Sequence, residues 1–492
     1  MSEPSRSVGC MGLLDRAEQR RTTSLASLDK AKQAQQGQYF TPRLAARIIA
    51  AMPRVPERGD LRVLDPGAGS GILSAALIER IAHECPDLNV HVTAVENDPH
   101  LHAALRETLG DLESAGRVQT ELVDEDFLRW ALATEQRFDV IVQNPPYHKL
   151  SSSSAEQDLL RRNGVVVPNI YAAFLALGLR LLDEGSQQVA ITPRSWMNGT
   201  YYAPFRREFA NRVAVDAIHT FESRRKVFAD TGVLQESIIV AATRNGVKGS
   251  VSIATSVDHS TEPRRRVVDY TDIVTPDFIH VPATDRDAQA VSWMTRAANS
   301  TLDDLGLSVS TGRVVDFRSR GLIYREPPVG AVPMVHATHV RPGRAVHPLV
   351  QVKKPEWFHD STGANEKLLV PGGAYVLIKR FSAKEERRRV VAAVWTSDNP
   401  AAFDNKLNFI HLGGKGLDPE LAYGLMIFLN STQLDDYFRV FSGHTQVNAT
   451  DLRQMRFPTS EQLRRLAATD PSSQANIDEA VNSVLGAEEA AV

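Results

Sequence analysis

The residues best suited to chemistry lie in one short segment, Asn144-Pro145-Pro146-Tyr147. It follows residues 140–142, a β-branched apolar run that predicts a buried strand. Two consecutive prolines end this strand, because proline cannot donate a backbone hydrogen bond, and Pro145 keeps Asn144 out of the helical region. The loop therefore presents an amide, backbone carbonyls and an aromatic ring in a stiff arrangement. Hydrogen-bond acceptors beside a stacking surface suit a flat group that carries an amine.

A second segment has the composition of a nucleotide-binding turn. Residues 61–64 predict another strand, which runs into a glycine-rich turn over 65–71 and then into an apolar helix over 72–83. Glycines in such a turn allow the backbone to approach a bound nucleotide closely. A third predicted strand, over 90–95, ends at Glu96, where a carboxylate can bind ribose hydroxyls. Together these segments predict a cofactor that carries a nucleoside.

The charge near this turn indicates which cofactor it binds. Asp65 precedes the glycines Gly67 and Gly69, and a carboxylate there would repel a pyrophosphate but attract an ammonium or sulfonium group. S-adenosylmethionine carries both of these cations. After a further predicted strand, Asp126 can accept a hydrogen bond from the adenine amine and Phe127 can pack on the adenine ring. Asp126 can also be the N-cap of the next helix, and the two roles are compatible.

Composition excludes several other classes of protein. The 492 residues suffice for two or three domains, and 42% hydrophobic with 23% charged residues is ordinary for a soluble globular protein. The two cysteines, Cys10 and Cys85, lie far apart, so we predict neither a disulfide framework nor a metal site. We see no signal peptide and no membrane-spanning run, which predicts a cytoplasmic location without membrane contact. The net charge of -3 gives no overall basic character, although a local basic surface could still bind phosphates.

In chain order, the motifs resemble those of amino-methylating DNA methyltransferases, in the order of the γ-class N6-adenine enzymes. The matching segments are Gly37-Gln38-Tyr39-Phe40-Thr41-Pro42, Asp65-Pro66-Gly67-Ala68-Gly69-Ser70-Gly71, Glu96-Asn97-Asp98, Asp126-Phe127 and Asn144-Pro145-Pro146-Tyr147. Downstream the chain is similar to the PstI/BsuBI-type modification methylases of restriction systems, within the Eco57I-like family. The resemblance covers residues 30 to 460. It implies an α/β fold: a Rossmann-like doubly wound methyltransferase sheet with a C-terminal mixed α+β target-recognition domain.

The resemblance also implies a role for each motif. The residues expected to bind S-adenosylmethionine are Tyr39, Phe40, Thr41, Asp65, Gly67, Gly69, Glu96, Asp126, Phe127 and Asn144. The catalytic residues would be Asn144, Pro145, Pro146 and Tyr147, with the adenine amine held between the Asn144 side-chain oxygen and the Pro145 carbonyl. Tyr147 would stack on a base flipped out of duplex DNA. Phe228 would stack on the opposite face of that base, or serve as a hydrophobic staple.

Two segments carry residues suited to contact with DNA. The side chains that we predict to bind it, besides Tyr147 and Phe228, are Arg224, Lys226, His444, Gln446, Asn448 and Arg453. Residues 441–453 are dense in groups that read base edges, since Gln and Asn suit adenine and Arg suits guanine. A polar loop that caps a helix would have the same composition. Basic runs such as 264–266 and 387–389 favour a phosphate-binding surface, although a charge run is often only a solvated face.

These patterns predict a domain organisation. We expect an N-terminal extension over 1–36, a catalytic domain over 37–246, a target-recognition domain over 247–460 and a C-terminal tail over 461–492. The predicted function is methyl transfer from S-adenosylmethionine to adenine N6 in double-stranded DNA, as the modification component of a restriction-modification or related defence system, with a cognate endonuclease encoded separately.

Other functions stay open on the sequence alone. Asn-Pro-Pro-Tyr also serves RNA and protein-glutamine methyltransferases, which generally lack so large a downstream region. A DNA-binding module with a decayed catalytic site is a third alternative. The resemblance suggests CTGCAG as the recognition sequence, which the residues themselves do not encode.

Overall fold

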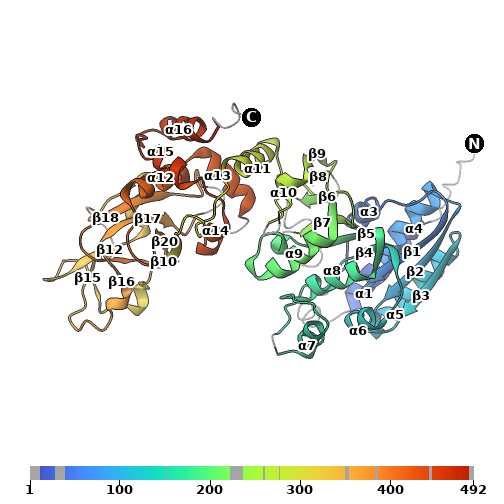
Figure 1. The fold of residues 1–492 in the computed structure, drawn as a ribbon. Helices are drawn as coiled ribbons and strands as arrows, with labels where there is room; N and C mark the ends of the chain where they lie inside the picture. The colour runs from blue at the N-terminus through green and yellow to red at the C-terminus, as the bar shows by residue number, and fades with distance from the viewer. Residues whose placement is uncertain are drawn as a thin grey trace, which may run out of the picture. The chain divides into compact units, whose positions relative to one another are not determined.

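The computed structural model describes residues 11–27, 39–151, 153–221, 237–258, 261–275, 278–349, 354–382, 386–442 and 446–486. The chain divides into two compact units, Met1–Ala283 and Thr284–Val492. Each unit has its own sheets, helices and apolar core (Figure 1). No helix in the described part of the chain combines the length and the apolar character needed to span a bilayer.

One nine-stranded sheet organises the first unit, in the order β3-β2-β1-β4-β5-β7-β6-β8-β9. Its strands are β1 (Gly59–Pro66), β2 (Leu88–Val95), β3 (Val118–Val123), β4 (Phe138–Gln143), β5 (Leu182–Pro193), β6 (Val213–Phe221), β7 (Ser237–Arg244), β8 (Ser250–Ser256) and β9 (Arg264–Asp269). The first five strands are parallel, whereas β7 is antiparallel to both β5 and β6. The chain order reverses where β1 lies beside β4. Such a switch point leaves a crevice at the carboxyl ends of the two strands, where sheets of this kind bind ligands.

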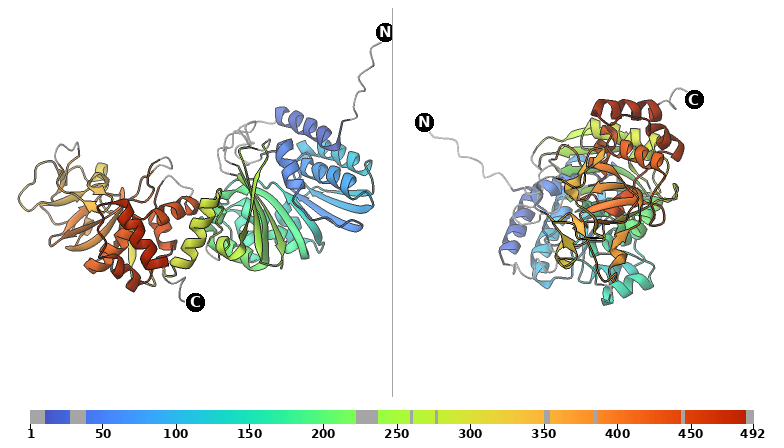
Figure 2. Two further views of the ribbon diagram at one scale, coloured as in Figure 1. Left: turned by 90° about the horizontal axis from the view of Figure 1, so that it is seen from above. Right: turned by 90° about the vertical axis from the view of Figure 1, so that its left-hand side faces the viewer.

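Helices cover both faces of this sheet (Figure 2). One face packs against α1 (Leu13–Ser27), α3 (Arg43–Ala50), α4 (Ile72–Glu84) and α5 (Pro99–Glu113), and the other against α6 (Phe127–Ala133), α7 (Ala155–Arg162), α8 (Ile170–Leu181), α9 (Ala203–Arg212) and α10 (Tyr270–Ile273). Successive side chains of β4 alternate between the two cores, Val140 and Val142 in one and Ile141 in the other. Because both faces of β4 are buried, its sequence is apolar at consecutive positions rather than at every second one. The predicted doubly wound sheet is confirmed.

The border of the first unit lies later than the sequence suggests. We expected the catalytic domain to end at residue 246, but β8 pairs with β6 and β9 pairs with β8. These two strands complete the sheet, and the unit extends to Ala283. The basic run 264–266 therefore lies on the edge strand β9 of the first unit. Charged side chains on an edge strand discourage pairing with another chain.

The second unit is a mixed α+β structure, as predicted. Its strands form three sheets, ordered β10-β20-β17-β18, β11-β15-β12-β19-β16 and β13-β14. They are β10 (Ser308–Thr311), β11 (Ile323–Tyr324), β12 (Val332–Val335), β13 (Val340–Arg341), β14 (Arg344–Ala345), β15 (Trp357–Phe358), β16 (Leu369–Val370), β17 (Gly373–Lys379), β18 (Ala392–Ser397), β19 (Ala401–Phe403) and β20 (Leu407–His411). Its helices are α11 (Asp285–Ala297), α12 (Pro419–Leu429), α13 (Thr432–Phe441), α14 (Ala449–Gln454), α15 (Ser460–Leu466) and α16 (Gln474–Gly486).

The last two helices belong to this unit rather than to a separate tail. Helix α15 packs against α12 and α16, and Leu463 and Leu466 are fully buried. The closest approach is at Gly424, where an added Cβ would lie 1.8 Å from the carbonyl oxygen of Leu463. Only a glycine allows the two helix backbones to come so near.

This approach predicts that Gly424→Ala destabilises the second unit. The methyl group would force α12 and α15 apart, at a cost of about 2 kcal/mol or more. Gly110→Ala is the matched control, because Gly110 lies within α5 and an added Cβ there meets no atom within 4 Å. In calorimetric unfolding, Gly424→Ala should lower the transition temperature, whereas Gly110→Ala should not lower it. Equal transition temperatures for Gly424→Ala and the wild type would contradict the packing of α15 on α12.

Candidate functional site

A cavity of about 300 Å³ lies at the carboxyl ends of β1 and β4. Nine of the ten residues predicted to bind the cofactor line it, and Asp65 is the exception. The full lining is Tyr39, Phe40, Thr41, Gly67, Ala68, Gly69, Ser70, Ile72, Leu73, Val95, Glu96, Asn97, Leu101, Glu125, Asp126, Phe127, Leu128, Asn144, Pro146, His148, Glu156, Ile170 and Phe174. The volume lies at the lower end of the range for small-molecule sites.

Hydrogen bonds to the neighbouring strand fix the glycine-rich turn. Gly67, Gly69 and Gly71 have φ values of 68°, 59° and 81°, a region that glycine adopts without strain. The N–H group of Gly67 donates to the carbonyl of Val95 (2.8 Å), and that of Gly69 donates to the Glu96 carboxylate (2.8 Å). The turn after β1 is therefore fastened to the end of β2. Its backbone forms one wall of the cavity.

The charges around the cavity suit a cationic ligand. Four carboxylates line it, those of Glu96, Glu125, Asp126 and Glu156, and its described lining includes no lysine or arginine. Burial raises the pKa of Glu96 above its usual range. A ligand with an ammonium or sulfonium group would be attracted here, whereas a pyrophosphate would be repelled. The hydroxyl of Ser70, buried and without a partner among the described residues, adds a group that a ligand could satisfy.

Asp65 has a different position from the one predicted. Its carboxylate is buried behind the turn, where it accepts hydrogen bonds from the N–H (3.2 Å) and the hydroxyl (2.7 Å) of Ser74. Burial raises the pKa of Asp65 to about 7, and the bonds from Ser74 offset only part of this effect. Asp65 thus holds the first turn of α4 against β1 instead of lining the cavity. The sequence could not separate these two positions for a carboxylate at the end of a strand.

One end of the cavity carries the groups predicted for adenine. Asp126 accepts a hydrogen bond from the N–H of Arg129 (3.1 Å) and so is the N-cap of α6, while it also lines the cavity. Phe127 lies beside Phe174, with ring centroids 4.5 Å apart. The sequence did not reveal Phe174, because α8 is apolar on all sides and gives no signal for one ring among many. His148 and Glu156 were missed as well.

Asn144 is held by a segment about one hundred residues earlier in the chain. Its Nδ2 group donates to the carbonyl oxygen of Tyr39 (2.6 Å) and to the hydroxyl of Thr41 (3.0 Å). Because a carbonyl can only accept, the amide nitrogen must face Tyr39, and Oδ1 must face away from it. Tyr39 and Thr41 were predicted as cofactor residues, and the structure adds this second contact. The orientation of the Asn144 acceptor is therefore fixed.

In the structure, Tyr147 is the hydrogen-bond donor to the Asn144 side-chain oxygen. Its hydroxyl donates to Asn144 Oδ1 (3.1 Å), and its ring lies 5.5 Å from the Tyr39 ring and 6.1 Å from the Tyr171 ring, centroid to centroid. Tyr171 in turn stacks on Tyr202 at 5.9 Å. An aromatic cluster thus adjoins the amide. Neither Pro145 nor Tyr147 lines the cavity, whereas Asn144 and Pro146 do.

Apart from Tyr147, the residues predicted to bind DNA divide into two groups. Arg224, Lys226, Phe228 and His444 lie outside the described residues. The other three lie in the second unit, where Gln446 forms a β-bridge with Phe381, Asn448 caps helix α14, and Arg453 donates to the carbonyl of Val309 (2.7 Å). The alternative interpretation, a polar loop that caps a helix, thus describes Asn448 correctly.

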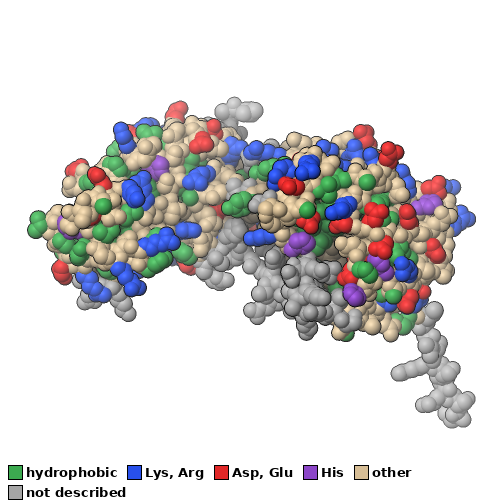
Figure 3. Space-filling view, turned by 90° about the horizontal axis from the view of Figure 1, so that it is seen from below, with side chains coloured by type: hydrophobic (Ala, Val, Ile, Leu, Met, Phe, Trp, Pro, Cys, Tyr) green, Lys and Arg blue, Asp and Glu red, His purple; other side chains and the backbone are tan. Residues whose placement is uncertain are grey.

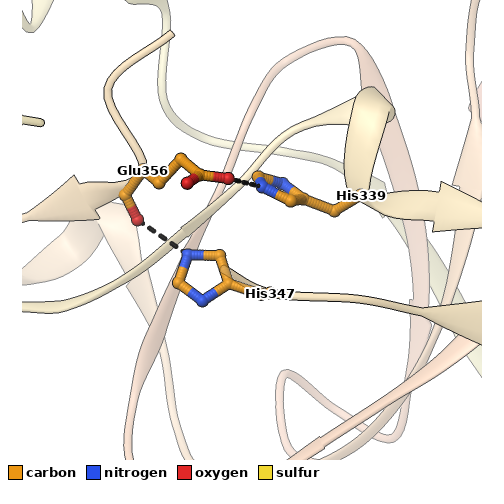
Figure 4. A group of neighbouring side chains, drawn as sticks. All are labelled: His339, His347 and Glu356. Carbon is orange, nitrogen blue, oxygen red and sulfur yellow. Dashed lines mark hydrogen bonds and ion pairs between the residues drawn. The ribbon is translucent and has the colours of Figure 1, made fainter. Parts of the chain in front are cut away.

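A group of ionisable side chains in the second unit was not predicted. His339 donates through Nε2 to the Glu356 carboxylate, and His347 donates to the backbone carbonyl of Glu356 at 2.8 Å (Figure 4). The Nδ1 atom of His339 accepts from the N–H of His336 (2.7 Å), so the proton of the neutral ring must be on Nε2. That nitrogen therefore has no lone pair to offer a cation. The group is a hydrogen-bonded network that joins residues 336–347 to Glu356.

The position of Asp65 predicts how stability depends on pH. Its pKa is about 7 in the folded chain and about 3.9 when unfolded. The protonated form is favoured by folding, so its contribution to stability is largest at low pH and is lost as the pH rises toward 7. Asp65→Asn keeps an oxygen acceptor for Ser74 but cannot ionise. Between about pH 5 and pH 8, its unfolding temperature should fall less than that of the wild type.

Asp60→Asn is the control for this measurement, since Asp60 is an exposed carboxylate on the same strand. It should follow the wild-type pH dependence. If Asp65→Asn does the same, the buried charge of Asp65 has no effect on stability.

Known proteins resemble this chain over nearly its whole length. Residues 85–228 match the family described as Eco57I restriction-modification methylase. The type II methyltransferase M.BsuBI of Bacillus subtilis is 37% identical over 452 residues, which cover 87% of this chain and 88% of that protein. M.PstI of Providencia stuartii is 34% identical over 489 residues, or 94% and 96% of the two chains.

A solved structure extends the likeness to the fold. The type IIL restriction-modification enzyme MmeI, determined in complex with DNA, is 12% identical with a TM-score of 0.51, over 96% of this chain and 74% of that one. This comparison supports the arrangement of elements alone. Because its sequence is 37% and 34% identical to those of M.BsuBI and M.PstI over most of its length, the chain belongs to the family of type II restriction-modification methyltransferases.

Proposed function

We propose that this methyltransferase transfers a methyl group from S-adenosylmethionine to N6 of an adenine flipped out of duplex DNA. The observation that carries the proposal is the fixed acceptor of Asn144 at the edge of a cavity lined by carboxylates. The cavity suits the cationic cofactor, and the acceptor suits an amine. Both lie at the switch point of the sheet, between β1 and β4.

Different residues of the cavity would bind different parts of the cofactor. The backbone of Gly67 and Gly69 would approach it most closely, and Glu96 would accept hydrogen bonds from its ribose hydroxyls. Asp126 and Phe127 would hold the adenine ring through its amine and its face. When bound, S-adenosylmethionine supplies an electrophilic methyl group on its sulfonium.

The amide of Asn144 and the carbonyl of Pro145 would activate the target amine. The lone pair of adenine N6 is delocalised into the ring, so the nitrogen is a poor nucleophile. Two acceptors that hold its N–H bonds favour a tetrahedral nitrogen with an available lone pair. The same dipoles stabilise the positive charge that develops on N6 during transfer. Because Tyr39 and Thr41 fix the amide in advance, little reorganisation is needed when the base arrives.

Tyr147 would exchange partners when the base enters. Its hydroxyl now donates to the acceptor that the target amine needs. The base must displace this hydroxyl, and the released ring can then stack on the base. Cytosine C5 methylation is a poorer fit, because it requires a cysteine nucleophile and Cys85 does not line the cavity.

Duplex DNA is the substrate that this chain fits best. The second unit supplies a large region outside the catalytic sheet, which RNA and protein-glutamine methyltransferases with the same motif generally lack. We further propose that a separately encoded restriction endonuclease recognises the same site, and that the two proteins form one restriction system. CTGCAG is the first sequence to test.

The test of the function is methylation of genomic DNA. The purified protein is incubated with labelled S-adenosylmethionine and unmethylated genomic DNA, and the modified bases are mapped by long-read sequencing. N6-methyladenine at one short sequence is the expected result. Label on RNA or protein, or cofactor binding without transfer, would contradict the proposal.

Replacing the amide should abolish catalysis and spare cofactor binding. We expect Asn144→Ala to lower the rate of methyl transfer by about 100-fold or more, the usual cost of losing one group that stabilises transition-state charge. Affinity for S-adenosylmethionine, measured by calorimetry, should change little. Asn163→Ala removes an exposed amide at the end of α7 and should keep full activity. Normal methylation by Asn144→Ala would exclude the assigned role.

The exchange of partners by Tyr147 predicts different effects for two substitutions. Tyr147→Phe keeps the ring and removes the competing hydroxyl, so DNA should bind equally well or up to about 10-fold more tightly. Tyr147→Ala loses stacking and should bind about 10-fold or more weakly. Binding to a cognate duplex and single-turnover transfer rates measure both effects. Equal impairment of the two variants would mean that the hydroxyl, rather than the ring, holds the substrate.

A further inference from the structure

One exposed aromatic side chain lies next to a predicted base-reading residue. Phe381 follows β17 and is 51% exposed, between the buried Ile378 and the buried Ser382. Its backbone forms a β-bridge with Gln446. Exposed single rings are common and mean nothing by themselves. The position of this one, beside a side chain suited to adenine, is the feature to explain.

The backbone around both residues is firmly held. The N–H of Val447 donates to the carbonyl of Arg380 (2.7 Å), and the carbonyl of Val447 accepts from the side chain of Asn408 (2.7 Å). Val447 and Asn408 are both fully buried. Arg380 is bound on its other side by the carbonyl of Lys406, which accepts its N–H at 3.0 Å. Phe381 and Gln446 are therefore presented at fixed positions rather than on a loose loop.

Positive charge adjoins the ring. The guanidinium of Arg380 lies 6.0 Å from the centre of the Phe381 ring. Lys379 directly precedes Arg380 in the chain. Burial is the largest cause that lowers the Lys379 pKa, and the nearby positive charge of Arg341 is the second. Figure 3 shows basic side chains at several separate places on the visible face of this unit, so its positive charge is not confined to one patch.

Not all predicted basic residues can contribute to such a surface. In the run 387–389, Arg388 donates to backbone and side-chain oxygens near residues 430–432, and Arg389 is buried. These two arginines stabilise the unit from within. The basic residues near Phe381 are half-buried or exposed. Arg380 donates to the carbonyl of Asn405 through one guanidinium nitrogen (3.3 Å), which leaves its other donors for an anion.

We propose that Phe381 stacks on a base of the recognition site, with Gln446 at a neighbouring base edge and Arg380 on the adjacent phosphate. An aromatic ring can stack on any base, whereas a glutamine amide distinguishes adenine. A ring inserted between base steps would also open the stack locally, which lowers the cost of flipping a base out of the duplex. Phe381 is thus a positioning residue for DNA. This inference rests on the proposed function, because it requires a DNA substrate.

The chain offers a matched control at Phe317. That ring is also exposed and lies 5.4 Å from the guanidinium of Arg318, in the same unit. No described residue among those predicted to read bases is its strand partner. Phe317 therefore shares the exposure and the neighbouring charge of Phe381 but not its position.

The test compares binding of the full-length variants to a duplex that carries the methylated site from the mapping experiment. Phe381→Ala should weaken binding between about 5-fold and 150-fold, the range for loss of one stacked base. The slope of affinity against salt should stay at the wild-type value, because no phosphate contact is lost, whereas Arg380→Ala should lower it by about one. Phe317→Ala should bind like the wild type. Because these residues lie in the second unit and the cofactor cavity lies in the first, the calorimetric unfolding transition of each variant, compared with that of the wild type, reports that its second unit is folded.

Tryptophan variants give a second readout. Addition of the duplex should quench the extra emission of Phe381→Trp, because a stacked base quenches indole, and leave that of Phe317→Trp unchanged. If the wild type methylates DNA but Phe381→Ala binds within twofold of it, the inference fails and the proposed function stands. A reduced salt slope for Phe381→Ala, or equal quenching at both positions, would also overturn it. If the wild type does not methylate DNA at all, the proposed function itself fails.

Discussion

The orientation of one side-chain amide is the constraint on which this site depends. Asn144 has two hydrogens to donate and one oxygen to accept, and the carbonyl of Tyr39 settles which end faces which way. Rotating the amide would place its oxygen against the Tyr39 carbonyl oxygen, whereas the Thr41 hydroxyl could bond to either end of the amide. Strand β4 is buried on both faces, and Asn144 follows directly at its carboxyl end. Tyr39 and Thr41, which precede α3, then determine the direction in which the Asn144 oxygen points. The site therefore needs both segments of the chain.

The negative charge of the cavity is a second constraint, and it has a cost. Burial raises the pKa of Glu96, which lines the cavity, and of Asp65, which lies behind the glycine turn, so the charged form of each carboxylate is disfavoured. Backbone N–H groups of Gly69 and Asp98 offset part of this cost at Glu96. The same bonds fix the carboxylate against the glycine turn. A cationic ligand would supply further compensation.

The sequence was a good guide wherever one local rule decided the outcome. Proline and β-branched residues located the end of β4, and glycines with positive φ located the turn after β1. It was a poor guide where several environments suit the same residue type. Asp65 is a buried partner of Ser74 rather than a cavity residue. Phe174 is one apolar residue on an apolar helix, and nothing local marks it as part of the cavity.

The sequence also could not show that the first unit extends to Ala283, beyond the predicted boundary at residue 246. Strands β8 and β9 are short and partly polar, and only the pairing of β8 with β6 and of β9 with β8 assigns them to the catalytic sheet. Such non-local pairing leaves no signature in the strand itself. The network of His339 and Glu356 is similar, because its members are separated in sequence and each would be unremarkable alone.

Two asparagines show how a structural amide differs from one available for chemistry. Asn408 and Asn144 both donate from Nδ2 to the backbone carbonyl of a distant residue, Val447 in one case and Tyr39 in the other. The oxygen of Asn408 accepts from the hydroxyl of Thr311 in a buried setting that no substrate can enter. The oxygen of Asn144 accepts from Tyr147, which is only partly buried, and Asn144 itself lines the cavity. Because a hydrogen bond from a tyrosine hydroxyl is worth only about 1 kcal/mol, an incoming amine can replace it. The donors of Asn144 provide rigidity, and its replaceable partner provides access.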